Sequence, residues 1–373
     1  MEPTMGIIYT GERNIDLQDL TRARPVATLP FGGRYRIIDF ILSNMVRSSI
    51  TNIGVITQSN YSSVIDHLGS GADWDLDRRR DGLFIFPPCS VQDTGGWFKG
   101  SAEALQSIAH YIQRSRQKYC VVSGSHMAYS LSLEQMMQYH QERAADITMA
   151  YYEDPQLTQV DSAHCTLLQT TPDGRIYDIA VQPRTPSGRK VYMELCILEK
   201  ELLLQLVDKC VVRGHYHLVR DGILSNLQAL QVYGYQFAGY VARVDSVQSY
   251  YQHNMALLDQ KVRDQLITSA GKVLTKVKNE PPTRHASGAR VRNCLVANGC
   301  RIYGEVENSV LFRGVRIDKG ARVCNSIIMQ GSHVGEDTLL EQVVLDKSVV
   351  ISPGKSLIGQ ANYPLVISKG VTV

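Results

Sequence analysis

The C-terminal part of the chain, from about Val291 onward, repeats short apolar residues at intervals of six positions. Ile317 and Val323 are six residues apart, and Gly314 and Gly320 keep the same interval. The spacing recurs at Val334 and Leu340 and at Val344 and Val350. Short strands with glycines at the corners and a six-residue period are typical of a parallel β-helix. We therefore predict a β-helix of hexapeptide repeats, with a sandwich of short strands as the alternative.

The preceding part of the chain follows a different pattern. Strand-like segments at 5–10, 52–58 and 118–124 alternate with helix-like segments such as 37–50. Strands that alternate with helices of this length indicate βαβ units and a mostly parallel sheet. A Pro/Gly-rich connector at 278–289 separates the two patterns. The predicted fold is thus an α/β, Rossmann-like domain (1–262), a connector (263–285) and a left-handed parallel β-helix (286–373).

Composition excludes several classes of protein. A net charge of +3 is too small for general nucleic-acid binding, and no run of about 18 apolar residues predicts a membrane-spanning helix. The N-terminus lacks the basic and apolar regions of a signal peptide. The eight cysteines include no C-x-x-C pair, so no zinc or redox motif is predicted. We expect a cytoplasmic protein that binds neither nucleic acid nor membranes.

The strand predicted at 118–124 ends without an acidic residue. In an open parallel sheet, ligands bind at the carboxyl ends of the strands, where many enzymes place a carboxylate that holds a metal ion. Here the strand runs directly into Ser125 and His126. The pattern is that of a catalytic strand end from which the metal ligand is missing.

Several specific motifs cover nearly the whole chain. They are LPFGGRYRIIDFILSNMVRSSITNIGVITQ (29–58), HLGSGADWDLDRR (67–79), LFIFPP (83–88), WFKGSAEAL (97–105), ENSVLFRGVRI (307–317) and SIIMQGSHVGE (326–336). With these motifs the chain resembles the ADP-glucose pyrophosphorylases, which are glucose-1-phosphate adenylyltransferases. The resemblance implies a nucleotidyltransferase domain followed by the family's left-handed β-helix.

The family's chemistry joins a sugar phosphate to ATP, and three of its parts are altered here. The glycine-rich phosphate loop is reduced to Gly11, which we interpret as a turn, followed by Glu12, Asp16 and Asp19. By resemblance, Ser125 stands where active enzymes have one metal-binding Asp. Arg243 stands where they have the second, and Asp245 follows two residues later.

The sugar-binding positions are altered too. Val181 and Gln182 replace a Glu-Lys pair, and Tyr192 and Glu194 replace small residues. Loss of one preorganised electrostatic group lowers a rate by about 10²–10³. We therefore predict no catalytic residues, with Ser125 and Arg243 as degenerate positions, and no metal site or cofactor. Mg²⁺ is expected only at a catalytic partner subunit.

Arginines in the first fifty residues remain a candidate binding site. By resemblance to the family's effector sites, Arg22, Arg24 and Arg36 are expected to bind a phosphorylated sugar, since a guanidinium suits phosphate oxygens. Solvated surface arginines, or ion pairs to a partner subunit, are the alternatives. Arg313 and Arg316 are weaker candidates for the same junction.

The chain thus resembles the GlgD-type, non-catalytic subunits of the family. This implies a regulatory subunit that forms a hetero-oligomer with a catalytic ADP-glucose pyrophosphorylase subunit. One alternative is an active adenylyltransferase whose metal ligands are Asp245 or Glu194. A second is an acyltransferase that uses His333, and a third is an assembly scaffold without ligands.

Overall fold

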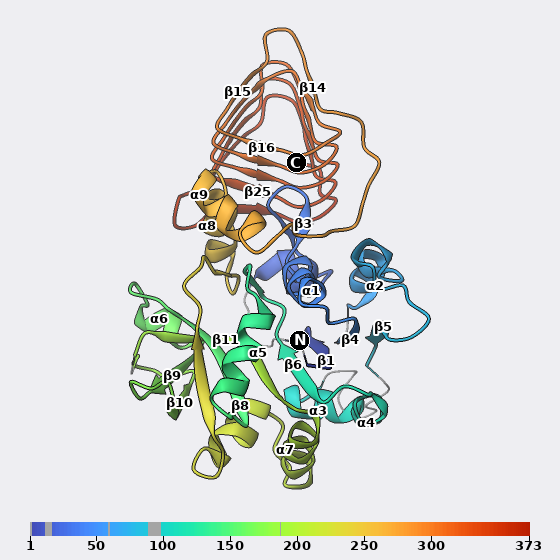
Figure 1. Ribbon diagram of the computed structural model, residues 1–373. Coiled ribbons are helices and arrows are strands. Elements are labelled where there is room, and N and C mark those ends of the chain that lie inside the picture. The colour runs from blue at the N-terminus through green and yellow to red at the C-terminus, as the bar shows by residue number, and fades with distance from the viewer. Residues whose placement is uncertain (1, 12–16, 59, 89–97, 187) are drawn as a thin grey trace.

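The computed structural model describes residues 2–11, 17–58, 60–88, 98–186 and 188–373. An α/β domain occupies one end of the molecule and a β-helix the other (Figure 1). Both predicted parts of the fold are confirmed. The helix α9 spans Gln260–Arg263 and continues into a π-helix at Asp264–Thr268. The first β-helix strand, β14, spans Arg284–His285, at the end of the predicted connector.

The α/β domain is built on a nine-stranded sheet. Its parallel centre has the order β5 (Gly82–Phe86), β4 (Asn52–Ile56), β1 (Thr4–Tyr9) and β6 (Tyr119–Ser123). Strand β11 (Lys190–Glu199) then pairs with β6 in the antiparallel direction. Beyond β11 lie β8 (Ile147–Glu153), β12 (Val232–Gln236), β9 (Thr166–Thr170) and β10 (Ile176–Val181).

Helices cover both faces of this sheet because its strands are apolar on both sides. Ile7 packs on one face and its neighbour Ile8 on the other, as strand geometry requires. One face carries α3 (Ser101–Ser107), α4 (Ala109–Arg114) and α7 (Lys200–Val212). The other carries α1 (Ile38–Arg47), α2 (Ser62–Leu68) and α5 (Leu133–Glu142).

The β-helix consists of three five-stranded parallel sheets. The first contains β14 (Arg284–His285), β17 (Arg301–Ile302), β20 (Arg316–Ile317), β23 (His333–Val334) and β26 (Val350–Ile351). The second contains β15 (Arg290–Arg292), β18 (Glu305–Glu307), β21 (Arg322–Cys324), β24 (Leu339–Glu341) and β27 (Ser356–Ile358). The third contains β16 (Leu295–Val296), β19 (Val310–Leu311), β22 (Ile327–Ile328), β25 (Val343–Leu345) and β28 (Leu365–Ile367).

The predicted apolar positions are largely, but not wholly, inside the coil. Ile317 and Val323 are fully buried in it, as predicted. Val344 and Val350 keep the six-residue interval but do not fill the interior, because Val344 points out of the coil toward the α/β domain and Val350 is 37% exposed. Leu345 and Ile351, one residue later in each case, fill the interior instead.

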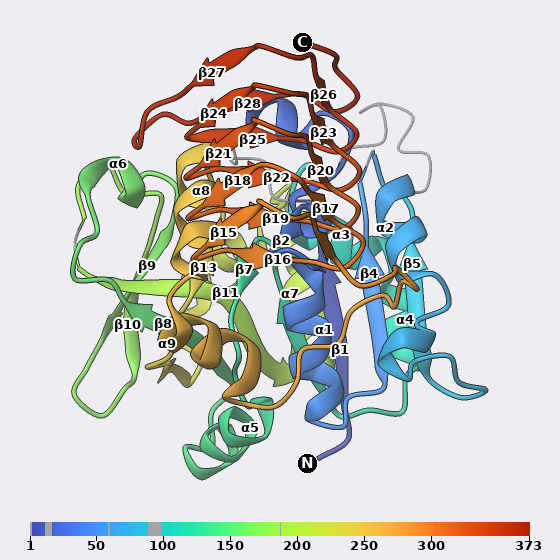
Figure 2. The same cartoon turned by 90° about the horizontal axis from the view of Figure 1, so that it is seen from above.

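The third sheet of the β-helix faces the α/β domain, and the coils lie across that domain (Figure 2). Phe312 and Met329 from this sheet share one buried core with Phe31 and with Tyr250 of α8 (Val247–Ala256). The Tyr251 hydroxyl donates a hydrogen bond to the Asn325 carbonyl at 2.6 Å. The two parts therefore pack through a continuous apolar interface. No helix in the described part of the chain is long and apolar enough to cross a membrane.

Candidate functional site

A cavity of about 370 Å³ opens at the carboxyl ends of the central parallel strands. Tyr9 ends β1, and His126 lies just after β6 and before β7 (Met127–Ala128). Glu194 of β11 and Asp245, just after β13 (Ala242–Arg243), complete the polar lining on this side. Ligands bind at this edge of open α/β sheets, so the cavity is the candidate active site.

The expected phosphate loop lies partly outside the described residues, because Glu12 and Asp16 are not described. Gly11 is described, and side chains crowd it. A Cβ atom there would lie 2.0 Å from Gln58 Nε2 and 2.3 Å from the Tyr9 hydroxyl. Gln58 Nε2 in turn donates to the Tyr9 hydroxyl at 2.5 Å. Any larger residue at position 11 would displace the ends of the Gln58 and Tyr9 side chains, which occupy the space beside Gly11.

The two degenerate positions predicted from the sequence lie close together in space. Arg243 pairs with Met127 across the two-stranded β7–β13 sheet, and the Val244 amide donates to the His126 carbonyl at 2.9 Å. Ser125 is fully buried and Arg243 is 7% exposed. Neither lines the cavity, but their neighbours His126 and Asp245 do.

Asp245 is neutralised by groups of its own chain. Arg243 Nη2 lies 2.5 Å from Asp245 Oδ2, in an ion pair between two largely buried side chains. The Ser249 hydroxyl donates to Asp245 Oδ1 at 2.9 Å. Burial opposes the charge of Arg243, but the nearby Asp245, with Tyr152 and Cys165, outweighs it and raises the arginine's pKa. A permanent cation therefore lies against this carboxylate.

The positions that the family resemblance assigns to sugar binding lie in or beneath the same cavity. Val181, Gln182 and Glu194 line the cavity, whereas Tyr192 is buried in the core beneath it. Gln182 and Glu194 have positive φ angles of 50° and 53°, which are uncommon for residues other than glycine. Such backbone strain concentrates at binding sites. The structure thus brings most of the sequence-predicted sugar positions to one cavity.

The side chains present do not suit Mg²⁺, which the family's chemistry uses. Magnesium prefers octahedral oxygen ligands, usually carboxylates that are free to coordinate it. Of the two cavity carboxylates named above, Asp245 already contacts Arg243 and Ser249. Across the described residues, no group of three His, Cys, Asp or Glu side chains could hold a metal ion.

The remaining wall contains residues that the sequence analysis missed. Lys99, His217 and Arg220 line the cavity beside the π-helix at Leu218–Ile223. Arg220 Nε donates to Asp221 Oδ1 at 2.7 Å, and Asp221 Oδ2 accepts from the His217 amide at 2.9 Å. These bonds hold the cationic wall in place. No periodicity or glycine pattern in the sequence marks this segment as part of a site.

A second cluster of charges lies at the junction of the two domains. Arg24 is 4% exposed and pairs through Nη2 with Asp346, which is fully buried just after β25. Its other terminal nitrogen, Nη1, is buried and has no hydrogen-bond partner among the described residues. A buried guanidinium donor without a partner is costly and marks a place where an anion would be stabilised.

Lys347, which the sequence analysis did not single out, belongs to the same cluster. Burial and the nearby Arg36 and Arg24 lower the pKa of its amine to about 7. Arg36 Nη1 donates to the Ser63 carbonyl at 2.8 Å, and its Nη2 lies 3.6 Å from Asp66. Arg24, Arg36 and Lys347 thus surround a region in which Asp346 is the buried counter-charge.

The other arginine candidates are placed differently. Arg22 is exposed, and its guanidinium makes no hydrogen bond or ion pair with the described residues. Burial, together with the nearby positive charge of Arg34, lowers the pKa of Arg313. Arg316 was a wrong prediction for the junction, because it points outward from the first sheet of the β-helix and pairs with Asp318 at 2.7 Å.

His333, the residue considered for acyl transfer, is also on this outer sheet. Its Nε2 lies 2.5 Å from Asp318 Oδ2, and Asp318 also pairs with Arg316, so the imidazole belongs to a polar surface cluster. It does not line the cavity at the strand ends.

Comparisons with known proteins agree with this architecture. A nucleotidyl transferase family model matches residues 5–258, and a GlmU-like C-terminal hexapeptide model matches 280–363. The chain is 36% identical to the glycogen biosynthesis protein GlgD of Bacillus subtilis over 371 residues, covering 98% of this chain and 96% of that protein. It is 36% identical to GlgD of Geobacillus stearothermophilus, covering 95% and 92%. A glucose-1-phosphate adenylyltransferase of Acetivibrio thermocellus is 31% identical, covering 99% and 88%.

Proposed function

Since this chain belongs to the nucleotidyltransferase family of the GlgD proteins and glucose-1-phosphate adenylyltransferases, we propose that it is a regulatory subunit in glycogen synthesis. Its catalytic partner makes ADP-glucose from ATP and glucose 1-phosphate. The chain itself has little or no activity and acts in the cytoplasm as part of a hetero-oligomer.

The ion pair between Arg243 and Asp245 carries the catalytic half of this proposal. Adenylyl transfer requires a divalent metal to absorb charge on the departing pyrophosphate. A guanidinium 2.5 Å from the cavity carboxylate occupies the place and the charge-balancing role that a metal would need. Ser125, the other degenerate position, is buried and has no carboxylate to offer. The cavity retains Lys99, His217 and Arg220 as polar groups for binding without turnover.

The junction cluster carries the regulatory half. Arg24, Arg36 and Lys347 come from both domains, and Arg24 has a buried donor without a partner. A phosphorylated sugar placed here would pair with these cations and cross-link the two domains. Arg22, exposed beside the cluster in sequence, remains a candidate for the outer edge of this site.

An effector bound at this junction would influence the partner through linkage. If effector binding favours the activated state of the complex, anything else that favours that state must in turn tighten effector binding. The continuous core between the domains provides a physical route, because Phe312 and Phe31 pack in one cluster.

A mixing experiment tests this role. The purified chain is added to a catalytic glucose-1-phosphate adenylyltransferase from the same cell, and ADP-glucose formation is followed with and without fructose 1,6-bisphosphate. We expect a higher rate or an altered effector response on mixing, and a smaller change with the Arg24→Ala variant. An unchanged rate and response, with co-elution of the two chains also absent, would refute the regulatory role.

An active adenylyltransferase is the second candidate, because Glu194 and Asp245 do line one cavity. A direct assay of pyrophosphate release by the chain alone separates it from the regulatory role. A pure scaffold is separated by calorimetry with ATP, ADP-glucose and fructose 1,6-bisphosphate, because a scaffold would bind none of them.

A further inference from the structure

The outer side of the first β-helix sheet carries a column of basic residues, three arginines and a histidine, that neither the cavity nor the junction uses. Arg284 pairs in register with Arg301, Arg301 with Arg316, and Arg316 with His333. The three arginines are exposed and His333 is 37% exposed. Rungs of a parallel sheet are about 4.8 Å apart, so the four side chains form a straight row about 14 Å long.

This column is not neutralised along its length. Asp318 pairs with Arg316 at 2.7 Å and with His333 at 2.5 Å, so one end of the column has a counter-charge. Arg284 and Arg301 have no ion pair with the described residues. Like charges on adjacent strands are destabilising. Repulsion within the column therefore destabilises the free protein, and an anion bound along the column would relieve that repulsion.

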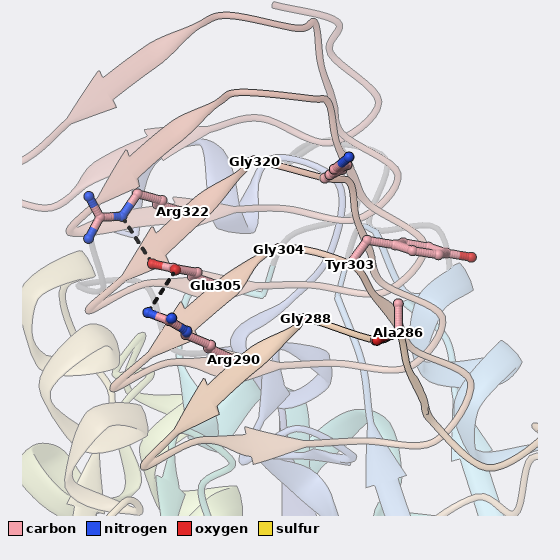
Figure 3. A pocket seen from close by; sticks show the side chains of 10 residues that line it. Ala286, Gly288, Arg290, Tyr303, Gly304, Glu305, Gly320 and Arg322 are labelled. Carbon is pink, nitrogen blue, oxygen red and sulfur yellow. Dashed lines mark ion pairs between the residues drawn. The ribbon is translucent and has the colours of Figure 1, made fainter.

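A groove of about 500 Å³ adjoins the column at the corner between the first and second sheets (Figure 3). Gly288, Gly304 and Gly320 stack at this corner, which leaves the floor of the groove without bulky side chains. Arg290 and Arg322 stand on the second sheet, on either side of Glu305, with which both pair.

The far wall of the groove joins it to the column. Tyr303, which is 36% exposed, follows β17 by one residue and so lies beside Arg301 on the outer side of the first sheet. Lys319 also lines the groove and is exposed. Cations thus border the groove on both sheets, with Glu305 as the acidic side chain in its lining.

We propose that this column and groove bind a linear phosphate chain. Guanidinium groups pair with phosphate oxygens in a bidentate manner, and a row of evenly spaced arginines suits an anion whose charges repeat along its length. The site faces away from the α/β domain, since the third sheet of the coil makes that contact. It is therefore separate from the junction cluster and does not depend on the proposed regulatory role.

Calorimetric titration of the full chain with inorganic polyphosphate tests the site. We expect binding that weakens with salt, and a loss of about tenfold or more in affinity for Arg301→Glu. Arg292→Glu is the control, because Arg292 is also exposed, pairs with Glu307 on the second sheet, and lies outside the column and the groove. The control is expected to bind within about twofold of the unmodified chain.

Arg301→Gln provides a readout that a structural role would not give. Removing one unpaired cation from the column should raise the unfolding temperature slightly. It should also weaken polyphosphate binding and reduce, by about one, the steepness with which the logarithm of the binding constant falls with the logarithm of the salt concentration. Absence of polyphosphate binding at low salt, or equal losses in Arg301→Glu and Arg292→Glu, would overturn the proposal.

ATP without Mg²⁺ distinguishes the source of the phosphate chain. If ATP binds as tightly as polyphosphate, and both Arg301→Glu and Tyr303→Ala weaken it, the chain is supplied by a nucleotide whose base stacks on Tyr303. If polyphosphate binds more tightly and Tyr303→Ala has no effect, the ligand is the inorganic chain. Binding of double-stranded DNA in preference to both would contradict the proposal.

Discussion

The cavity at the strand ends and the cluster at the domain junction use the same residue types in opposite ways. In the cavity, Arg243 lies against Asp245, so a cation of the chain satisfies the carboxylate. At the junction, Arg24 and Lys347 lie about the buried Asp346, and Arg24 keeps a buried donor without a partner. The first arrangement has no charge left for a metal, and the second has positive charge left for an anion. This difference is what the proposed regulatory role requires of the two sites.

The largest expected effect comes from breaking the junction pair with Asp346→Asn. Removing one member of a buried ion pair leaves uncompensated charge and costs about 3–5 kcal/mol. We expect a loss of that size in the free energy of unfolding, measured with urea. Asp66→Asn is the control, because Asp66 is 71% exposed and should change stability by less than about 0.5 kcal/mol. Equal small effects would show that Asp346 is not the counter-charge of the cluster.

The cavity side of the comparison is tested by restoring acids. The double variant Ser125→Asp with Arg243→Asp removes the cation that pairs with Asp245 and adds a carboxylate at each of the two degenerate positions. We expect Mn²⁺ to bind about a hundredfold more tightly than to the unmodified chain, and electron paramagnetic resonance measures this affinity. Arg243→Ala alone is the matched intermediate and should gain less. A double variant that folds but binds Mn²⁺ no better would contradict the assigned geometry.

The variant Arg24→Ala tests whether the junction cluster binds an anion. Loss of one charge-assisted contact to a phosphate group should weaken fructose 1,6-bisphosphate binding by about tenfold or more. Arg189, exposed and distant in sequence, gives a control variant, Arg189→Ala, that should bind as the unmodified chain does. Calorimetry measures both. If Arg24→Ala binds normally, the unpartnered donor does not serve an anion.

A smaller effect is expected from pH. The pKa of Lys347 is about 7 in the folded chain, below the ordinary 10.5, so the amine is largely neutral at higher pH. An anion favours the charged amine, so its binding takes up a proton, and affinity should fall about threefold to tenfold from about pH 7 to about pH 9. Sulfate is the probe, because its own charge is constant over this range. Lys347→Met should abolish the dependence, whereas an unchanged profile in that variant would assign the proton elsewhere.

The same shift predicts the pH dependence of stability. Between about pH 7 and 10.5 the unfolded chain holds a proton on Lys347 that the folded chain has released. Unfolding then takes up protons, so this residue makes stability rise with pH in that window and lowers it below about pH 7. Comparing urea unfolding of the unmodified chain and Lys347→Met across the window measures this contribution.

The sequence predicted the regular parts of the fold because local patterns determine them. The six-residue period predicted the β-helix, and alternating apolar segments predicted the sheet of β1, β4 and β6. Register was harder, since Val344 and Leu345 are both apolar and only the docked α/β domain decides which one faces outward. The antiparallel insertion of β11 between β6 and β8 also follows from tertiary pairing, which no local period reveals.

The sequence indicated only those residues of the candidate site that lie at recognisable family motifs. Ser125 and Arg243 were placed together by resemblance and are close in the structure. The contact between Arg243 and Asp245 depends on side-chain direction, and Lys347 joins Arg24 across more than 300 positions of sequence. Such long-range contacts leave no trace in composition or spacing.

The most direct test of the account is pyrophosphate release by the isolated chain with ATP, glucose 1-phosphate and Mg²⁺. We predict a rate lower than that of a catalytic relative by many orders of magnitude, because Arg243 is paired with Asp245 and because the family resemblance implies altered metal ligands and an altered phosphate loop. A rate comparable to that of the catalytic enzyme, in protein purified from cells lacking that enzyme, would contradict it.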